Sequence, residues 1–191
     1  MRLSTLLLCV VTVVIVAATL GIVYYLKVVK VRGNEREVSL ALRSLVDAEA
    51  SFCSNDIDHN DVADYWTGDV AGLYYHHPLI EKSIALADVR PLKPLAPAPT
   101  PRMGYYFVAM ESDDSSGKAV PYKVDTDEKN GKVHNCWRFG FCAYPAEYGV
   151  TGRFTFLINE AGMMFKLDTG GEPVLKKPVD AHGDTYFGAT D

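Results

Sequence analysis

The sequence contains no charged residue between Leu3 and Leu26. At about 1.5 Å per helical residue, this run is long enough to cross the roughly 30 Å hydrocarbon core of a bilayer. The hydrophobic part of a cleaved signal peptide has only about 7–15 residues, so the length favours a retained anchor over a signal peptide. We therefore expect residues 3–26 to contact the lipid bilayer and residues 1–32 to form a transmembrane anchor with its flank.

The chain also has few basic residues. Its 191 residues include 19 Lys and Arg against 24 Asp and Glu, which gives a formal net charge of −5. No basic cluster offsets this acidity, and nucleic-acid-binding domains need a basic patch to neutralise phosphates. Nucleic acid is therefore not an expected partner, and the chain beyond the anchor is long enough for one domain of ordinary size.

The short motifs of common enzyme classes are missing. The sequence has no G-x-S-x-G, H-E-x-x-H, P-loop, dinucleotide-binding or C-x-x-C pattern, so we expect no catalytic residues and no enzyme activity. Glu147 lies in a predicted turn, where a structural pairing with Arg153 is favoured. His77 and Glu81 have the spacing of a helical pair but lack an evident third ligand, which disfavours a metal site there.

No proline occurs before Pro78, and a second helical pattern follows the anchor. Gly33 interrupts the apolar run, and Asn34 with Glu37 could cap a new helix. Residues 33–53 then carry apolar side chains spaced by three or four, while Glu49 is interpreted as lying off this stripe. This pattern predicts an amphipathic stalk helix, continuous with the anchor or gently kinked, whose packing face is Val38, Leu42, Leu45, Ala48 and Phe52.

An aspartate-rich stretch opens the next segment, residues 54–103. Its side-chain oxygens fit positions one, three, five and nine of a calcium-binding EF-hand loop at Asp56, Asp58, Asn60 and Asp64. Two other positions do not fit, since Asp61 replaces the invariant glycine and Thr67 replaces the bidentate glutamate. We favour a polar turn held by Asx-type hydrogen bonds, with a weak calcium site as the alternative, and expect no other cofactor.

The remainder of the chain changes from helical to strand-like patterns. Residues 68–89 predict short helices, and five prolines within residues 90–101 predict a stiff connector. In residues 104–191, strands are predicted at 104–110, 121–126, 136–144, 153–159 and 163–168, with a hairpin turn at 130–131, an exposed loop at 111–121 and a loosely packed tail. The predicted class is α+β: a long N-terminal helix packed on an antiparallel head that needs one face covered.

The cysteines leave several pairings open. Cys136 and Cys142 share one predicted strand, where they would lie about 20 Å apart, too far for a disulfide unless the chain bends. Cys53 could meet either of them where the stalk packs on the sheet. The favoured interpretation is that the cysteines are small buried residues.

The layout of an apolar helix, an amphipathic helix and a β-rich head resembles type IV pilins and the pseudopilins of type II secretion. The stretch NEREVSLALRSLVDAEASF at residues 34–52 looks like the second half of a pilin-type stalk. Pilins carry a glutamate near the start of the mature chain, whereas no acidic residue precedes Glu35 here. The resemblance therefore implies a pilin-like shape, without establishing processing or filament assembly. Secretion pseudopilins also carry calcium in their heads.

A second resemblance concerns the C-terminal half. Residues 139–162, FGFCAYPAEYGVTGRFTFLINEAG, followed by FKLDTGG, are similar to a bacterial family of unknown function with an AYPAxYGxTG turn and a TFxxN strand.

These resemblances lead to a functional expectation. Lys27, Lys30 and Arg32 after the anchor would place the head in the cytoplasm by the positive-inside rule. Pilin-like heads lie outside the membrane, and long domains can be translocated despite flanking charge, so we expect a single-pass cell-membrane protein of the bacterial envelope with most of its chain extracytoplasmic. It would act as a structural or interaction component, with other pilin-like subunits as partners. The alternative is a solitary ligand- or calcium-binding domain on a membrane tether.

Overall fold

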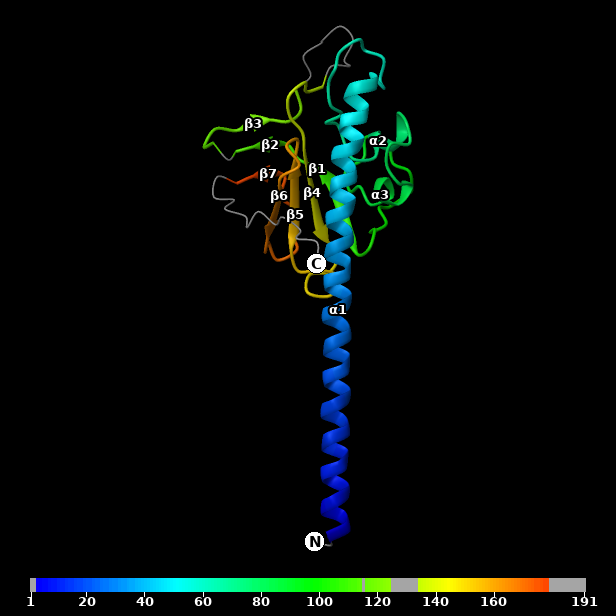
Figure 1. The fold of residues 1–191 in the computed structure, drawn as a ribbon, viewed down its shortest axis with the longest axis vertical. Helices are drawn as coiled ribbons and strands as arrows, with labels where there is room; N and C mark the ends of the chain where they lie inside the picture. The colour runs from blue at the N-terminus through cyan, green and yellow to red at the C-terminus, as the bar shows by residue number, and fades with distance from the viewer. Residues whose placement is uncertain (1–2, 115, 125–133, 179–191) are drawn as a thin grey trace.

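One helix, α1 (Leu3–Asn55), runs unbroken for 53 residues and carries the head at its C-terminal end (Figure 1). A computed structural model describes residues 3–114, 116–124 and 134–178, with the side chains of α1 described from Val11 onward. Residues 11–32, the exposed half of α1, include no buried side chain, whereas residues 34–55, the packed half, pass through the head. The predicted continuous rod from the apolar run to about Cys53 is confirmed.

The predicted helix start at Asn34 is wrong. Asn34 lies inside α1, and its side-chain amide donates a hydrogen bond of 2.7 Å to the carbonyl of Thr151 in the head. Gly33 also stays helical, with no atom within 4 Å of where a Cβ would lie. A helical glycine costs about 1 kcal/mol relative to alanine, which the packing of the following turns readily outweighs.

The main sheet of the head has four antiparallel strands in the order β1-β4-β5-β6. They are β1 (Tyr105–Ala109), β4 (Gly140–Pro145), β5 (Thr155–Asn159) and β6 (Met164–Leu167). The predicted α+β class and three of the predicted strands are confirmed. The predicted strand at 136–144 begins four residues late, because the Asn135 side chain accepts hydrogen bonds from the backbone of Trp137 and Arg138 and bends the chain.

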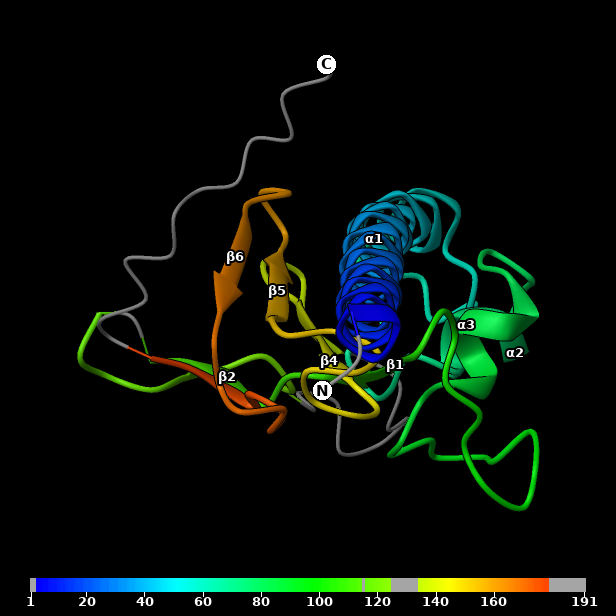
Figure 2. The ribbon, with the colours of Figure 1, turned by 90° about the horizontal axis from the view of Figure 1, so that it is seen from below.

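Two short helices cover another side of α1. Viewed along α1, the sheet lies on one side of it and α2 (Gly72–Tyr75) with α3 (Lys82–Leu86) on the other (Figure 2). Residues 90–101 contain neither helix nor strand. The packed half of α1 is therefore enclosed between two parts of the same head.

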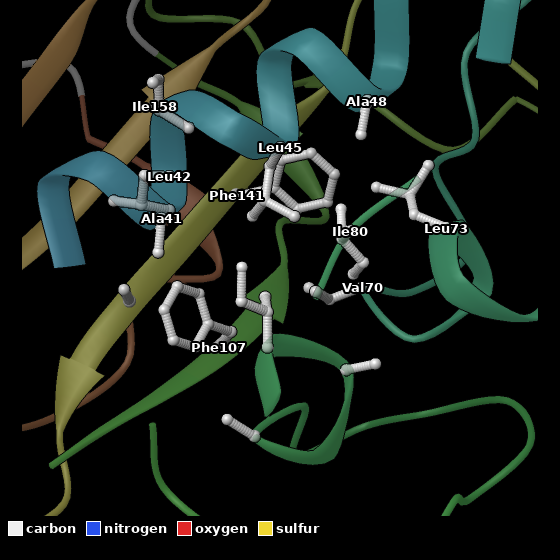
Figure 3. Close-up of a cluster of buried hydrophobic side chains, with 14 of the residues drawn as sticks. Ala41, Leu42, Leu45, Ala48, Val70, Leu73, Ile80, Phe107, Phe141 and Ile158 are labelled. Atoms are coloured by element: carbon white, nitrogen blue, oxygen red, sulfur yellow. The ribbon is translucent and has the colours of Figure 1, made fainter. Parts of the chain in front are cut away.

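The larger hydrophobic core lies between α1 and the sheet (Figure 3). Leu42 and Leu45 of α1 meet Phe107 of β1, Phe141 of β4 and Ile158 of β5 in this core. Burying a leucine or phenylalanine side chain stabilises the fold by about 1.5–3 kcal/mol. Each member of the predicted packing face is at most 3% exposed: Val38, Leu42, Leu45, Ala48 and Phe52.

A second core covers the opposite face of the sheet. Successive β4 residues alternate between the cores, since Phe141 faces α1 and Cys142 joins the second core. This core consists of Val108, Met110, Tyr122, Cys142, Leu157 and Phe165, with Val174 and Leu175 packed against it.

Three two-residue strands accompany the second core, and their sheet has the order β3-β2-β7. They are β2 (Ser112–Asp113), β3 (Val120–Pro121) and β7 (Lys176–Lys177), and β2 pairs with β7 in parallel. The predicted loop at 111–121 is therefore wrong at its two ends, where residues 112–113 and 120–121 lie in strands. Of the tail predicted to pack loosely, Lys176 and Lys177 lie in a strand, and residues 179–191 lie outside the described residues. In the predicted strand 121–126 only Pro121 is in a strand, residues 122–124 are not, and residues 125 and 126 lie outside the described residues, as does the predicted turn at 130–131.

Candidate functional site

The C-terminal end of α1 leads into a tight acidic turn. Asp56, His59 and Asp61 have positive φ angles of 45°, 58° and 62°, the left-handed region that aspartate tolerates better than most residues. The Asp56 carboxylate accepts hydrogen bonds from the backbone N–H of Asn60 and Asp61. These bonds form the polar turn that the sequence predicts.

Asn60 occupies the centre of this turn. Its amide nitrogen lies 3.0 Å from Asp58 Oδ2 and 3.2 Å from Asp64 Oδ2, and its amide oxygen accepts from the Val62 N–H at 2.7 Å. The structure thus brings together three of the four residues predicted for calcium, with Asp56 holding the adjacent backbone. The amide nitrogen of Asn60, a hydrogen-bond donor, therefore lies between the carboxylates of Asp58 and Asp64. A calcium site would place a further oxygen there.

Glu49 is a buried carboxyl that the sequence interpretation placed off the packing face. This placement is wrong because Glu49 follows Leu45 by four residues and therefore shares its face of the helix. Glu49 is 0% exposed, and its Oε2 accepts a hydrogen bond of 2.9 Å from the Trp66 N–H. Burial raises the pKa of Glu49 well above its usual range, and the nearby Asp64 carboxylate raises it further.

Asp64 and His134 connect the turn to the strand side of the head. Asp64 is 1% exposed, and its Oδ2 accepts a hydrogen bond of 2.6 Å from the His134 N–H. The His134 imidazole packs on Trp66 with ring centroids 4.6 Å apart, and its Nε2 lies 3.9 Å from Asp58 Oδ2. Burial and the Asp64 carboxylate raise the pKa of Asp58, which the charge of His134 partly opposes.

Two buried oxygens of this acidic corner, Glu49 Oε1 and Asp58 Oδ1, have no hydrogen-bond partner within the part of the chain that the structure describes. A buried carboxylate oxygen without a partner favours the protonated form of the acid or attracts a cation. Among the residues that the structure describes, however, no three His, Cys, Asp or Glu side chains are arranged to hold a metal ion. The calcium site at Asp56, Asp58, Asn60 and Asp64 therefore stays a prediction.

Asp69 and Asp88 form a second set of buried carboxylates that the sequence did not indicate. Asp88 Oδ2 accepts from the backbone N–H of Val70 and Ala71, while Asp69 Oδ1 accepts from Trp66 Nε1. Burial raises the pKa of Asp88 to about 6, against the opposing effect of these backbone donors. Their hydrogen bonds hold the loop before α2 and give both residues a structural role.

The remaining candidates lie apart from the acidic corner. His77 is exposed, and the Glu81 carboxylate pairs with Arg102 instead. The expected pairing of Arg153 with Glu147 is wrong, because Arg153 Nε lies 2.8 Å from Asp168 Oδ2. That pair is exposed, and such pairs contribute little to stability.

The three cysteines whose side chains the structure describes, Cys53, Cys136 and Cys142, are free thiols. Cys142 is fully buried, which raises its pKa to about 12 and confirms the favoured interpretation for this residue. Cys53 and Cys136 are partly exposed and so do not follow that interpretation. Cys53 lies one helical turn after Glu49, and burial, Asp64 and the neighbouring Cys136 raise its pKa.

Comparison with known proteins gives one match. A family model described as "Protein of unknown function (DUF2950)" matches residues 25–178, which cover the packed half of α1 and the described head. This match agrees with the predicted similarity of residues 139–171 to a family of unknown function, whereas no pilin or pseudopilin family supports the other resemblance. No curated protein and no solved structure matches the chain.

Proposed function

The chain belongs to the family described as Protein of unknown function (DUF2950), and since that description assigns no activity, we propose a function from the structure. The protein is a membrane-anchored, extracytoplasmic component of the bacterial envelope. It acts through the contacts of its helix and head and not as a catalyst.

The exposed half of α1 supports this proposal most strongly. An 18-residue window of α1 has a mean hydropathy of 2.1, and none of it is buried within the protein. Val13, Leu20 and Leu26 are 66%, 65% and 59% exposed. Leaving such a side chain in water forgoes about 1.5–3 kcal/mol, so the bilayer is the medium in which this half of the helix is stable.

The continuity of α1 supports a retained, pilin-like anchor. The same helix that leaves the apolar region enters the core of the head without a loop or hinge. A rigid connection of this kind transmits the position of the head directly to the bilayer and allows neighbouring helices to pack side by side. We propose that the contacts include other pilin-like subunits through this half of α1.

A second candidate is a solitary binding domain on a membrane tether. The partnerless buried oxygens of Glu49 and Asp58 favour it, because a ligand such as calcium would neutralise them. A binder of this kind stays monomeric in detergent and gains thermal stability on addition of calcium.

Photo-crosslinking separates the two candidates. A crosslinking residue placed at Val16, in the exposed half of α1, yields adducts of about twice the 21.0 kDa mass of the chain or adducts with another pilin-like protein. The matched control is the same residue at Lys118, which is exposed on the head and yields no such adduct. Monomer alone from both positions contradicts helix-mediated association and leaves the solitary binder.

A further inference from the structure

A groove of about 1020 Å³ lies where α1 enters the head. One wall is α1 from Tyr24 to Arg43, and the other comes from the turn after β4, from β5 and from β6. Six basic side chains line it, against one acidic side chain, Glu35. The basic residues are Lys27, Arg32, Arg36, Arg43, Arg153 and Lys166.

The two basic residues that the head contributes to the groove already have acidic partners. Lys166 Nζ lies 3.8 Å from Glu35 Oε2, and Arg153 pairs with Asp168. The four basic residues that α1 contributes to the groove are exposed. No ion pair joins them to an acid within the described part of the chain. The groove therefore keeps a positive charge that the described protein does not balance.

The helix concentrates this charge on one face. Arg32 and Arg36 are four residues apart and Arg43 follows seven residues later, so all three project from the same side of α1. Like charges at this spacing repel each other and destabilise a helix slightly. An anion bound across them removes that repulsion.

The groove also carries apolar surface. On the head side, Phe154 is partly exposed, with Lys166 Nζ 3.8 Å from the centre of its ring, while Phe156 and Met164 are 2% and 4% exposed. On α1, Tyr24 lines the groove and is 72% exposed. Leu40 adds an apolar side chain that is 53% exposed. A ligand that fits both walls carries a negative charge and a hydrocarbon portion.

The groove begins where the apolar run ends. At about 1.5 Å per residue, Arg32 lies about 9 Å and Arg36 about 15 Å beyond Leu26 along the helix axis. Headgroups and interfaces add about 10–15 Å in total to the hydrocarbon core of a bilayer. This is about 5–8 Å on each side, so the lower end of the groove, at Tyr24 and Lys27, lies among the lipid headgroups and Arg32 lies just above them if the exposed half of α1 spans the membrane. That membrane-spanning half is the proposed function on which this inference rests.

We propose that this groove binds an anionic phospholipid of the bilayer that holds the anchor. The lipid phosphate lies against Lys27 and Arg32, and its glycerol and upper acyl portion extend along Tyr24 and Val28 towards the bilayer. The bound lipid fixes the height and tilt of the head above the membrane.

The test uses the full-length chain in a neutral detergent, with native mass spectrometry to count bound lipids. Phosphatidylglycerol and phosphatidylcholine with identical acyl chains are offered in turn. The wild-type chain retains phosphatidylglycerol at least fivefold better, and this preference declines at high potassium chloride because the contact is ionic. In K27Q/R32Q/R36Q the phosphatidylglycerol affinity falls more than tenfold, whereas the charge-matched control K82Q/K93Q/K118Q keeps it.

Equal retention of the two lipids by the wild-type chain overturns the inference, whether or not the triple variant folds. An unchanged preference in a folded triple variant overturns it as well, as does selective displacement of the lipid by the control substitutions. The intact mass in the same spectra separates the two proposals. A chain lacking residues 1–26 overturns both, whereas a full-length chain without lipid preference overturns only the lipid site.

Discussion

The two halves of α1 are built from similar apolar residues but bury them very differently. In the exposed half, Val16, Leu20 and Tyr24 are 52%, 65% and 72% exposed. In the packed half, Leu42 and Leu45 are completely buried. The charged residues differ as well, since the exposed half has none up to Leu26 and the packed half has a charged outer face.

This difference shows what each half needs from its surroundings. A helix with one apolar face buries that face against a protein core. A helix that is apolar all around needs an apolar medium on every side. The packed half supplies that one face to the sheet and to α2. The exposed half has no such partner among the described residues, and the bilayer is the partner that we propose for it.

The largest expected difference between the halves comes from truncating a buried leucine. Leu45→Ala leaves a cavity between α1 and the sheet and lowers the free energy of unfolding of the head by about 2–5 kcal/mol. Leu20→Ala, the matched change in the exposed half, leaves it unchanged. Denaturant unfolding in detergent, followed by tryptophan fluorescence, measures both. Equal effects of the two substitutions contradict the division of α1 into halves.

The second prediction concerns the buried acid of the packed half. Burial raises the pKa of Glu49 in the folded state above its unfolded value, so the folded head binds a proton more tightly. This stabilisation is complete below the unfolded pKa and is lost as pH rises through the folded pKa. The melting temperature therefore falls from pH 5 towards neutral pH.

Two variants isolate the contribution of Glu49 between pH 5 and neutral pH. Glu49→Gln reduces the slope of melting temperature against pH. The slope that remains is attributed to Asp88, whose pKa is raised to about 6, and to Asp58, whose pKa is also raised. Asp168→Asn is the control, because its exposed carboxyl has a lowered pKa and titrates below the window. If melting temperature falls as steeply with pH in the Glu49→Gln variant as in the wild-type chain, the buried, protonated state of Glu49 is contradicted.

A third prediction tests the hydrogen bond at the boundary between the halves. Asn34→Ala removes the bond to the Thr151 carbonyl and leaves that acceptor without its partner, which costs about 1–3 kcal/mol. Asn55→Ala removes a comparable bond to Ser51, but on the exposed surface, and its effect stays within about 0.5 kcal/mol. Thermal unfolding of both variants checks this ranking of the two losses of stability. A larger loss in Asn55→Ala than in Asn34→Ala rejects it.

The smallest effect is expected at the boundary glycine. Gly33→Ala adds a Cβ where no atom lies within 4 Å and raises helix stability by about 0.5–1 kcal/mol. Gly117→Ala meets equally open space but has a φ of 78°, so the added strain destabilises the head. Calorimetry of the two variants gives shifts of opposite sign. A loss of stability in Gly33→Ala would indicate that α1 is interrupted there.

Periodicity made much of this architecture predictable. The spacing of Val38, Leu42 and Leu45 specified the packed face of α1, and alternation specified β1, β5 and β6. The same spacing rule predicts Glu49 on that face, but its charge led to the opposite interpretation. A buried carboxyl is identified only when its hydrogen-bond partner, here the Trp66 backbone, is known.

The second core could not be predicted in this way. Strands β2 and β7 have two residues each, too few for a period to be visible, and their pairing joins segments more than 60 residues apart. The bend before β4 depends on one Asn135 side chain and leaves no pattern in the sequence. The groove is likewise formed by residues distant in sequence, although the spacing of Arg32, Arg36 and Arg43 marks one of its walls.

Protease protection in spheroplasts, with intact mass measured on the same sample, tests the central proposal most directly. A full-length chain in the membrane fraction, whose head is degraded by external protease, is the predicted result. A head that stays protected until the membrane is dissolved, or a soluble chain lacking residues 1–26, would contradict it.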